Sequence, residues 1–315
     1  MARRRAVAVT APTRFPTGLI VRILGVILIL GLLGVLVLGG TAGFLTYRVV
    51  SSRNDTENVT PLSFLKSNYE NLNFTDRAGG EHEGWLLLGL KGAPAVILCH
   101  GYNSNRSELL SLGIVLQENH FNVYLFNFQS PRAKEPYTNL GIRQAQDLLE
   151  AIKTVTQQPG VNPRRVGLFG ATTGGYAVLA AAQVSSQVKA IVVDTVYENP
   201  EQMLEAQIDR LLGGSSSLFR VLAKTEFHLF TLGSKTPQVR ENLAKLEAMP
   251  KLFISGRDTP SLAATTEALY NLAPQPKRLL VLEHAQPALA SGSEKKEYEN
   301  QVLSFLLQNL PLRAD

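Results

Sequence analysis

The chain has 315 residues, of which 45% are hydrophobic and 18% charged, so it is long enough for one large α/β domain or two small ones. Its formal net charge is +5, but five of the 31 Lys and Arg residues precede residue 23, and the remaining 26 balance the 26 Asp and Glu residues. A phosphate-binding face needs a basic excess in the folded part, so this balance argues against a nucleic-acid partner. The single cysteine, Cys99, excludes an intrachain disulfide and makes a cysteine-based metal site untenable.

An uncharged apolar segment at residues 23–45 is the first predicted element. As a helix it would span roughly 34 Å at about 1.5 Å per residue, enough to cross a hydrocarbon core. It is longer than the apolar region of a cleaved signal peptide, which favours an uncleaved anchor, although the glycines at 39–43 leave a cleavage site open. The arginines in residues 1–22 have no acidic neighbours, whereas the charges after the helix are mixed. We therefore predict a single-pass membrane protein with a cytoplasmic N-terminal tail at 1–22 and an extracytoplasmic folded domain.

Residues 46–66 are polar and aperiodic, as expected of a juxtamembrane linker that includes some helix, and the folded domain is predicted over 67–315. Short apolar runs alternate there with longer amphipathic ones, which is typical of a mostly parallel sheet covered by helices on both faces. The predicted strands are 84–89, 93–99, 122–128, 165–170, 188–194, 251–255 and 278–283. The predicted helices are 106–118, 140–157, 174–184, 260–272 and 294–310.

The interval 197–249 interrupts this alternation with about 50 residues of helical character, broken by a Gly-Gly-Ser-Ser-Ser stretch. If it lies over the carboxyl ends of the strands, it forms a cap on a pocket. If it lies beside the sheet, it only completes the side layer. The sequence leaves both arrangements open.

A Gly-x-Thr-x-Gly segment, formed by Gly170, Thr172 and Gly174, joins an apolar strand to an Ala-rich helix. In the Gly-x-Ser-x-Gly motif of hydrolases, a sharp strand-to-helix turn holds a nucleophile in a strained backbone conformation, and glycines flank it because the chain is crowded there. Threonine at this position keeps the hydroxyl but adds a methyl group, and β-branched residues tolerate positive φ angles poorly.

Further motifs appear in a characteristic order. His100-Gly101-Tyr102 ends an early strand, and Leu252-Phe253-Ile254-Ser255-Gly256-Arg257-Asp258 forms a late strand and loop. With the Gly170–Gly174 segment between them, they make residues 70 to 310 resemble the α/β-hydrolase family, particularly its lipase, esterase and serine-aminopeptidase-like group. The resemblance implies an α/β-hydrolase fold without a metal or other cofactor, in which a triad attacks an ester, thioester or amide. The implied catalytic residues are Thr172 as nucleophile, His284 as base and Asp258 as acid, with the backbone N–H groups of Tyr102 and Thr173 as oxyanion hole and Gly101, Gly170 and Gly174 as motif glycines.

The base is the part of the triad that fits the family pattern least. His284 is the histidine after the last predicted strand, but spacing back from the last helix puts the family position nearer Gln286 or Pro287. A shift of two residues in an extended segment moves a side chain by roughly 6 to 7 Å, beyond hydrogen-bond reach unless the loop is remodelled. Asp194, at another strand end, is an alternative acid.

The other histidines have weaker claims to a catalytic role. His100 is interpreted as a structural residue of its turn, and no spacing among His82, His120 and His228 suggests a metal site.

The loop after Asn127 also departs from the family, which usually has Asp-x-Arg-Gly-x-Gly there, whereas this chain has Asn127 followed by Phe-Gln-Ser-Pro-Arg. Two functions therefore stand side by side. One is a membrane-anchored hydrolase with a threonine nucleophile. The other is a catalytically inactive protein of the same fold that binds a ligand or partner at the membrane. The retained hydroxyl, acid and oxyanion residues favour the enzyme, and the sequence leaves the substrate and the oligomeric state open.

Overall fold

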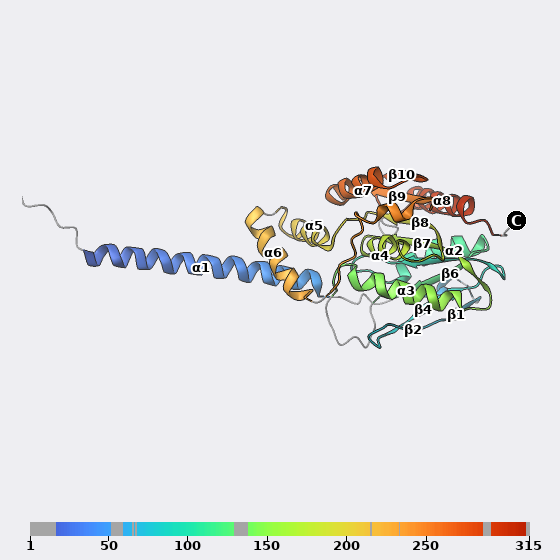
Figure 1. Cartoon of the computed structure of the whole chain (residues 1–315), viewed down its shortest axis with the longest axis horizontal. Helices are drawn as coiled ribbons and strands as arrows, with labels where there is room; N and C mark the ends of the chain where they lie inside the picture. Colours follow the sequence, from blue (N-terminus) through green and yellow to red (C-terminus); the bar gives the residue numbers. More distant parts are fainter. Residues whose placement is uncertain are drawn as a thin grey trace, which may run out of the picture.

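The computed structural model describes residues 17–51, 59–64, 66, 68–128, 138–214, 216–232, 234–285 and 291–312 (Figure 1). The strands are β1 (Tyr69–Asn71), β2 (Phe74–Thr75), β3 (Glu81–His82), β4 (Gly84–Leu87), β5 (Ala93–Cys99), β6 (Asn122–Phe126), β7 (Val161–Ala171), β8 (Val188–Asp194), β9 (Lys251–Gly256) and β10 (Lys277–Leu282). The α-helices are α1 (Thr17–Val50), α2 (Leu110–Glu118), α3 (Ile142–Thr156), α4 (Thr173–Ala182), α5 (Pro200–Leu212), α6 (Ser217–Phe230), α7 (Pro260–Leu272) and α8 (Gly292–Asn309). Short 3₁₀ helices occupy Pro61–Phe64, Arg106–Leu109 and Leu243–Leu246.

Eight strands form one sheet in the order β1-β4-β6-β5-β7-β8-β9-β10, and β2 pairs with β3 in a separate two-stranded sheet. The pairs β1–β4 and β4–β6 are antiparallel, and every pair from β6 to β10 is parallel. The carboxyl ends of β5, β7, β8, β9 and β10 therefore lie at one edge of the sheet. In open parallel sheets, ligands bind at this edge.

Helices cover both faces of the sheet, and the side chains of the central strands alternate between the two layers. In β5, Ala95, Ile97 and Cys99 pack into the layer that contains α3, α4 and α7. Val96 and Leu98 pack into the opposite layer with α2 and α8. Both faces of β5 are thus buried, which explains its continuous apolar run.

The strands and helices predicted for the folded domain are all present, with boundaries shifted by a few residues at most of their ends. The predicted 106–118 helix begins as a 3₁₀ turn before α2. β7 is longer than predicted, because it begins at Val161, which pairs with Ala93 of β5 ahead of the apolar run. β1, β2 and β3 contain only two or three residues each, and no apolar run predicts them.

The N-terminal helix α1 extends from Thr17 to Val50, beyond the predicted segment 23–45. By length and composition it is the one helix in the described part of the chain that is apolar enough to cross a membrane. Its apolar N-terminal part projects away from the folded domain, and its C-terminal part packs against α5 and α6 of the predicted cap (Figure 1). Ala42, Leu45 and Val49 are buried in this contact, so part of the predicted linker is helix that belongs to the core.

Candidate active site

Thr172 lies in a sharp turn between β7 and α4, at the carboxyl edge of the sheet. Its backbone angles are φ 44° and ψ −107°, and the residue is buried. A positive φ is strained for a β-branched residue, so the surrounding structure must hold it there. The turn is fixed by hydrogen bonds from the Thr172 N–H to the Asp194 carbonyl (2.9 Å) and from the Tyr176 N–H to the Thr172 carbonyl (3.0 Å).

The flanking glycines are required by close backbone contacts. A Cβ atom on Gly174 would lie 2.4 Å from the carbonyl oxygen of Cys99 and 2.5 Å from that of His100. A Cβ atom on Gly170 would lie 2.4 Å from the carbonyl oxygen of Gly174. Side chains cannot be accommodated at such distances without backbone movement. The spacing of Gly170 and Gly174 in the sequence therefore follows from the close approach of backbone atoms at this turn.

One of the two predicted oxyanion donors contacts the Thr172 hydroxyl. The Tyr102 N–H donates a hydrogen bond to Thr172 Oγ1 at 2.9 Å. Thr173 opens α4, so its N–H belongs to the first helical turn, where amides lack acceptors within the helix. In the conformation observed, the hydroxyl of Thr172 accepts the hydrogen bond of the Tyr102 N–H, which the resemblance assigns to a substrate oxyanion.

Both ring nitrogens of His100 contact main-chain atoms. Its Nδ1 lies 3.0 Å from the carbonyl oxygen of Gly101, which can only accept, and its Nε2 accepts from the Phe128 N–H at 3.2 Å. Both ring nitrogens are thus committed to main-chain partners, in agreement with the structural role predicted for this histidine.

The predicted acid and base both lie at the carboxyl edge, but the described contacts do not pair them. His284 follows β10 with a half-exposed side chain, and its Nδ1 is 3.0 Å from Oε2 of Glu294. The hydrogen bond to Glu294 and the charge of this carboxylate raise the pKa of His284, and Asp258 adds a smaller contribution. Asp258 Oδ1 accepts from the Ala285 N–H at 3.4 Å. Glu294, at the start of α8, is thus a functional candidate that the sequence motifs did not single out, because it lies outside them. Gln286 and Pro287, the alternative positions for the base, lie outside the described residues.

Asp194, the alternative acid, is fully buried, and both of its carboxylate oxygens accept hydrogen bonds from hydroxyls. Tyr298 donates to Oδ2 at 2.6 Å and Thr195 donates to Oδ1 at 2.7 Å. The bond from Tyr298 ties β8 to α8, and both oxygens of the alternative acid are thus engaged by hydroxyls in the observed conformation.

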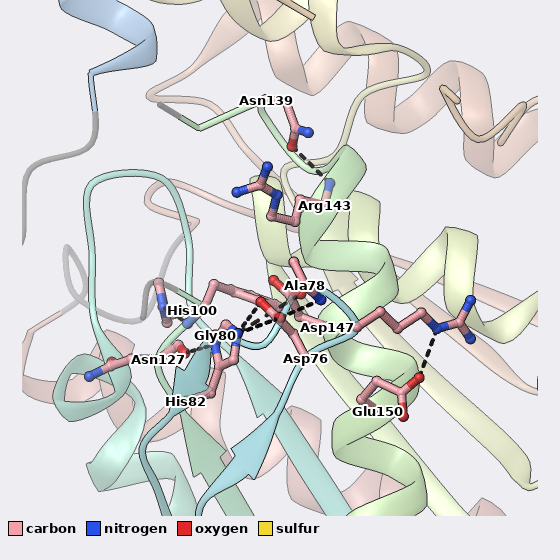
Figure 2. A network of polar contacts seen from close by, with 12 residues as sticks. Asp76, Ala78, Gly80, His82, His100, Asn127, Asn139, Arg143, Asp147 and Glu150 are labelled. Atoms are coloured by element: carbon pink, nitrogen blue, oxygen red, sulfur yellow. Dashed lines mark hydrogen bonds and ion pairs between the residues drawn. The ribbon is translucent and has the colours of Figure 1, made fainter. Parts of the chain in front are cut away.

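A second polar cluster, formed by Asp76, His82 and Asp147, lies under the end of β6 (Figure 2). His82 Nε2 is 3.2 Å from Asp76 Oδ2 and 4.0 Å from Asp147 Oδ1, and His82 Nδ1 is 2.9 Å from the carbonyl oxygen of Asn127. This arrangement fixes Asn127, which begins the altered loop. The remainder of that loop, from residue 129, lies outside the described residues.

The three side chains offer ligand atoms within 4.8 Å of one another, so the group could hold a metal ion, although its sequence spacing gives no sign of one. A carboxyl group binds a metal ion in its ionised form. Burial, followed by the nearby charge of Asp76, raises the pKa of Asp147 well above its usual value and so favours the neutral acid. Burial also opposes ionisation of Asp76, but hydrogen bonds from Gly80, His82 and Ala78 outweigh it and lower the pKa of Asp76. Through His82, which contacts Asp76 and the Asn127 carbonyl, the cluster connects the turn between β2 and β3 to the residue after β6.

No protein-family model matches the chain. Among solved structures, the Pyrococcus furiosus esterase Pf2001 superposes with a TM-score of 0.67 at 19% identity, over 83% of this chain and 98% of that one. Dienelactone hydrolase from Anabaena variabilis superposes with a TM-score of 0.56 at 20% identity, over 77% of this chain and 99% of that one. The chain has the α/β-hydrolase fold.

Two sequence relatives add to this comparison. YfhR of Escherichia coli O157:H7, an uncharacterised protein, is 25% identical over 252 residues, which cover 76% of this chain and 81% of YfhR. The thiohydrolase aneE of Aspergillus aculeatus is 28% identical over 128 residues, which cover 39% of this chain and 40% of aneE. The α/β-hydrolase fold expected from the motif order is thus confirmed, and hydrolases dominate its named neighbours.

Proposed function

We propose that the protein is a membrane-anchored hydrolase of ester, thioester or amide bonds that uses Thr172 as its nucleophile. The observation that carries this proposal is the strained turn at Thr172, whose buried hydroxyl lies 2.9 Å from the Tyr102 N–H. Strain of this kind persists where the surrounding structure enforces it, and such positions cluster at active sites. The named esterase, thiohydrolase and dienelactone hydrolase among the neighbours support this reaction class.

In the proposed reaction, Oγ1 of Thr172 attacks the carbonyl carbon of the substrate while His284 accepts the hydroxyl proton. The carbonyl oxygen becomes an oxyanion, which the N–H groups of Tyr102 and Thr173 stabilise. His284 then returns the proton to the leaving group, and an acyl group stays on Thr172. Water, deprotonated by His284, then attacks the acyl carbon; the bond from this carbon to Oγ1 of Thr172 breaks, His284 returns the proton to Oγ1, and the product leaves as a carboxylic acid. Asp258 is the proposed acid, and Glu294 holds Nδ1 of His284 in the observed conformation.

The proposed anchor is α1, which is long and apolar enough to cross a membrane. The arginines of residues 1–22 support a cytoplasmic N-terminus, and the folded domain would then lie on the other side. The membrane is thus the one partner that we propose.

A second candidate function is a non-catalytic binding protein with the same fold. Two observations favour it: the Tyr102 N–H is occupied by the Thr172 hydroxyl, and His284 pairs with Glu294. A hydroxyl that rests in the oxyanion site is not oriented for attack, and a base held elsewhere does not activate it.

Labelling of the full chain with a fluorophosphonate probe tests the enzyme proposal. We expect the wild type to be labelled, Thr172→Ala to be silent, and Thr225→Ala, which changes an exposed threonine on α6, to be labelled like the wild type. If the folded wild type is not labelled, or if Thr172→Ala is labelled equally, the proposed nucleophile is wrong and the binding function is preferred.

A further inference from the structure

Helix α6, in the interval 197–249 that the sequence leaves open as cap or side layer, has one face that is buried against the protein. Phe219, Ala223 and Phe227 recur every four residues and lie in the same apolar core as Leu45 and Val49 of α1. Thr46 also donates a long hydrogen bond of 3.5 Å to the Ala223 carbonyl. This face of α6 is therefore fixed to the C-terminal part of the proposed membrane helix.

The polar side chains of α6 form a second row, which is directed at α5. Three ion pairs connect the antiparallel helices: Arg220 with Asp209 at 3.1 Å, Lys224 with Glu205 at 2.5 Å, and His228 with Glu201 at 3.6 Å. The residues on α6 again recur every four positions, and their partners on α5 step back by four. Arg220, Lys224 and His228 are thus turned toward α5 and away from the third face, and the remaining charged residue of α6, Glu226, lies beside Gly43 of α1.

This third, outer face of α6 is largely apolar, although no described part of the chain covers it. We define it by Leu218, Val221 and Leu229 of α6 and by Leu232 just after the helix, whose exposed fractions are 59%, 60%, 63% and 75%; the exposed Thr225 lies in the same row. Single exposed apolar residues are common, but a contiguous group of large ones marks an interaction surface. A helix with charges on one side and such a face on the other is typical of a segment that lies in a membrane interface.

The position of α6 beside α1 indicates what covers its outer face. It crosses α1 at the point where α1 enters the folded domain (Figure 1). On one side of this crossing α1 is apolar and uncovered for more than twenty residues. Near the crossing α1 exposes Phe44 (62%) and Tyr47 (47%), and aromatic residues are enriched at the boundary between lipid and water. The outer face of α6 therefore continues the surface that α1 presents to lipid.

We infer that the outer face of α6 lies in the interfacial layer of the same bilayer that α1 crosses. This inference rests on the proposed anchoring by α1 and adds a second point of membrane contact. It also places the candidate active site close to the lipid surface, because the Tyr102 hydroxyl donates a 2.8 Å hydrogen bond to the carbonyl of Val49 at the end of α1.

Fluorescence of an environment-sensitive nitrobenzoxadiazole probe tests the inference on the full chain in phosphatidylcholine–phosphatidylglycerol vesicles. The probe is attached to Val221→Cys, and Val184→Cys is the matched control, because Val184 is a valine of similar exposure (65%) remote from α1 and α6. Cys99 competes little for the label, since it is fully buried and burial raises the pKa of its thiol. Leu30→Cys, within the apolar part of α1, reports on the anchor itself.

We expect doxyl-labelled phosphatidylcholine to quench the probe at 221 at least severalfold more than the probe at 184, and aqueous iodide to show the reverse order. Equal quenching by iodide at 221 and 184 would overturn the inference. So would shielding of position 221 from both quenchers, which would indicate a protein partner. If the probe at position 30 also escapes the lipid quencher, the proposed anchor fails; if only the probe at 221 does, the anchor stands and the α6 contact fails.

Discussion

Replacing Thr172 with serine should increase the rate of fluorophosphonate labelling. The methyl group of threonine restricts χ1, and in the observed conformation the hydroxyl accepts the Tyr102 N–H at 2.9 Å. Gly101 leaves the room that this hydroxyl occupies, because a Cβ atom at position 101 would lie only 2.7 Å from Thr172 Oγ1. Serine has the same hydroxyl without the methyl group, so it can leave this position at a lower steric cost.

The size of the increase follows from the donor that serine would free. Loss of one oxyanion-hole donor typically lowers kcat by about 10² to 10³. If the Tyr102 N–H is blocked by the threonine hydroxyl, its release in Thr172→Ser can restore up to about that factor. We therefore expect labelling to accelerate by at least about tenfold and by no more than about 10³-fold.

The assay is the second-order rate constant of labelling, followed by in-gel fluorescence in the same detergent for all variants. Thr225→Ser is the matched control, because it makes the same chemical change on the exposed surface of α6 and should leave the rate unchanged. A folded Thr172→Ser protein that is labelled at the wild-type rate, or more slowly, would refute the argument that the hydroxyl blocks the oxyanion site. A silent wild type with a labelled serine variant would indicate an intact pocket with a disabled nucleophile.

Three further predictions concern the framework of the site. Gly174→Ala should prevent stable folding or lower the melting temperature by more than about 5 °C in a thermal melt, because its Cβ atom would lie within 2.5 Å of two carbonyl oxygens at the end of β5; an unchanged melt would contradict this crowding. Tyr298→Phe removes a 2.6 Å hydrogen bond to buried Asp194 and should cost about 1 to 3 kcal/mol, or roughly 2 to 12 °C in melting temperature, measured by calorimetry against the wild type. Glu294→Gln should lower the pKa of His284, so the acidic limb of the labelling rate, which rises as the base loses its proton, should move to lower pH; a limb that does not move would exclude His284 as the base.

Local sequence patterns predicted most of the fold because the central strands are buried on both faces. β5, β6 and β8 are nearly continuous apolar runs, and such runs stand out between amphipathic helices. The short strands β1 to β3 escaped prediction because two or three residues carry no periodicity. The end of α1 at Val50 also escaped prediction, because burial of Leu45 and Val49 against α6 decides how far the helix continues into the predicted linker.

The candidate site was predicted unevenly for a similar reason. The turn at Thr172 is encoded by adjacent residues, so its glycines alone reveal it. The partner of His284 is not encoded in this way, because Glu294 belongs to another element and becomes a neighbour only after β10 and α8 are packed.

By itself, the sequence determined the order of strands and helices, the apolar N-terminal helix and the strained turn that carries Thr172. These features depend on residues that are close in the chain, on their hydrophobic pattern and on the space that glycine leaves. Only the tertiary structure decided that Asp194 is held by Tyr298, more than a hundred residues away, and that α6 turns Arg220, Lys224 and His228 toward α5 and a largely apolar face outward. Such contacts join side chains from distant segments, and no local pattern specifies which of them will meet.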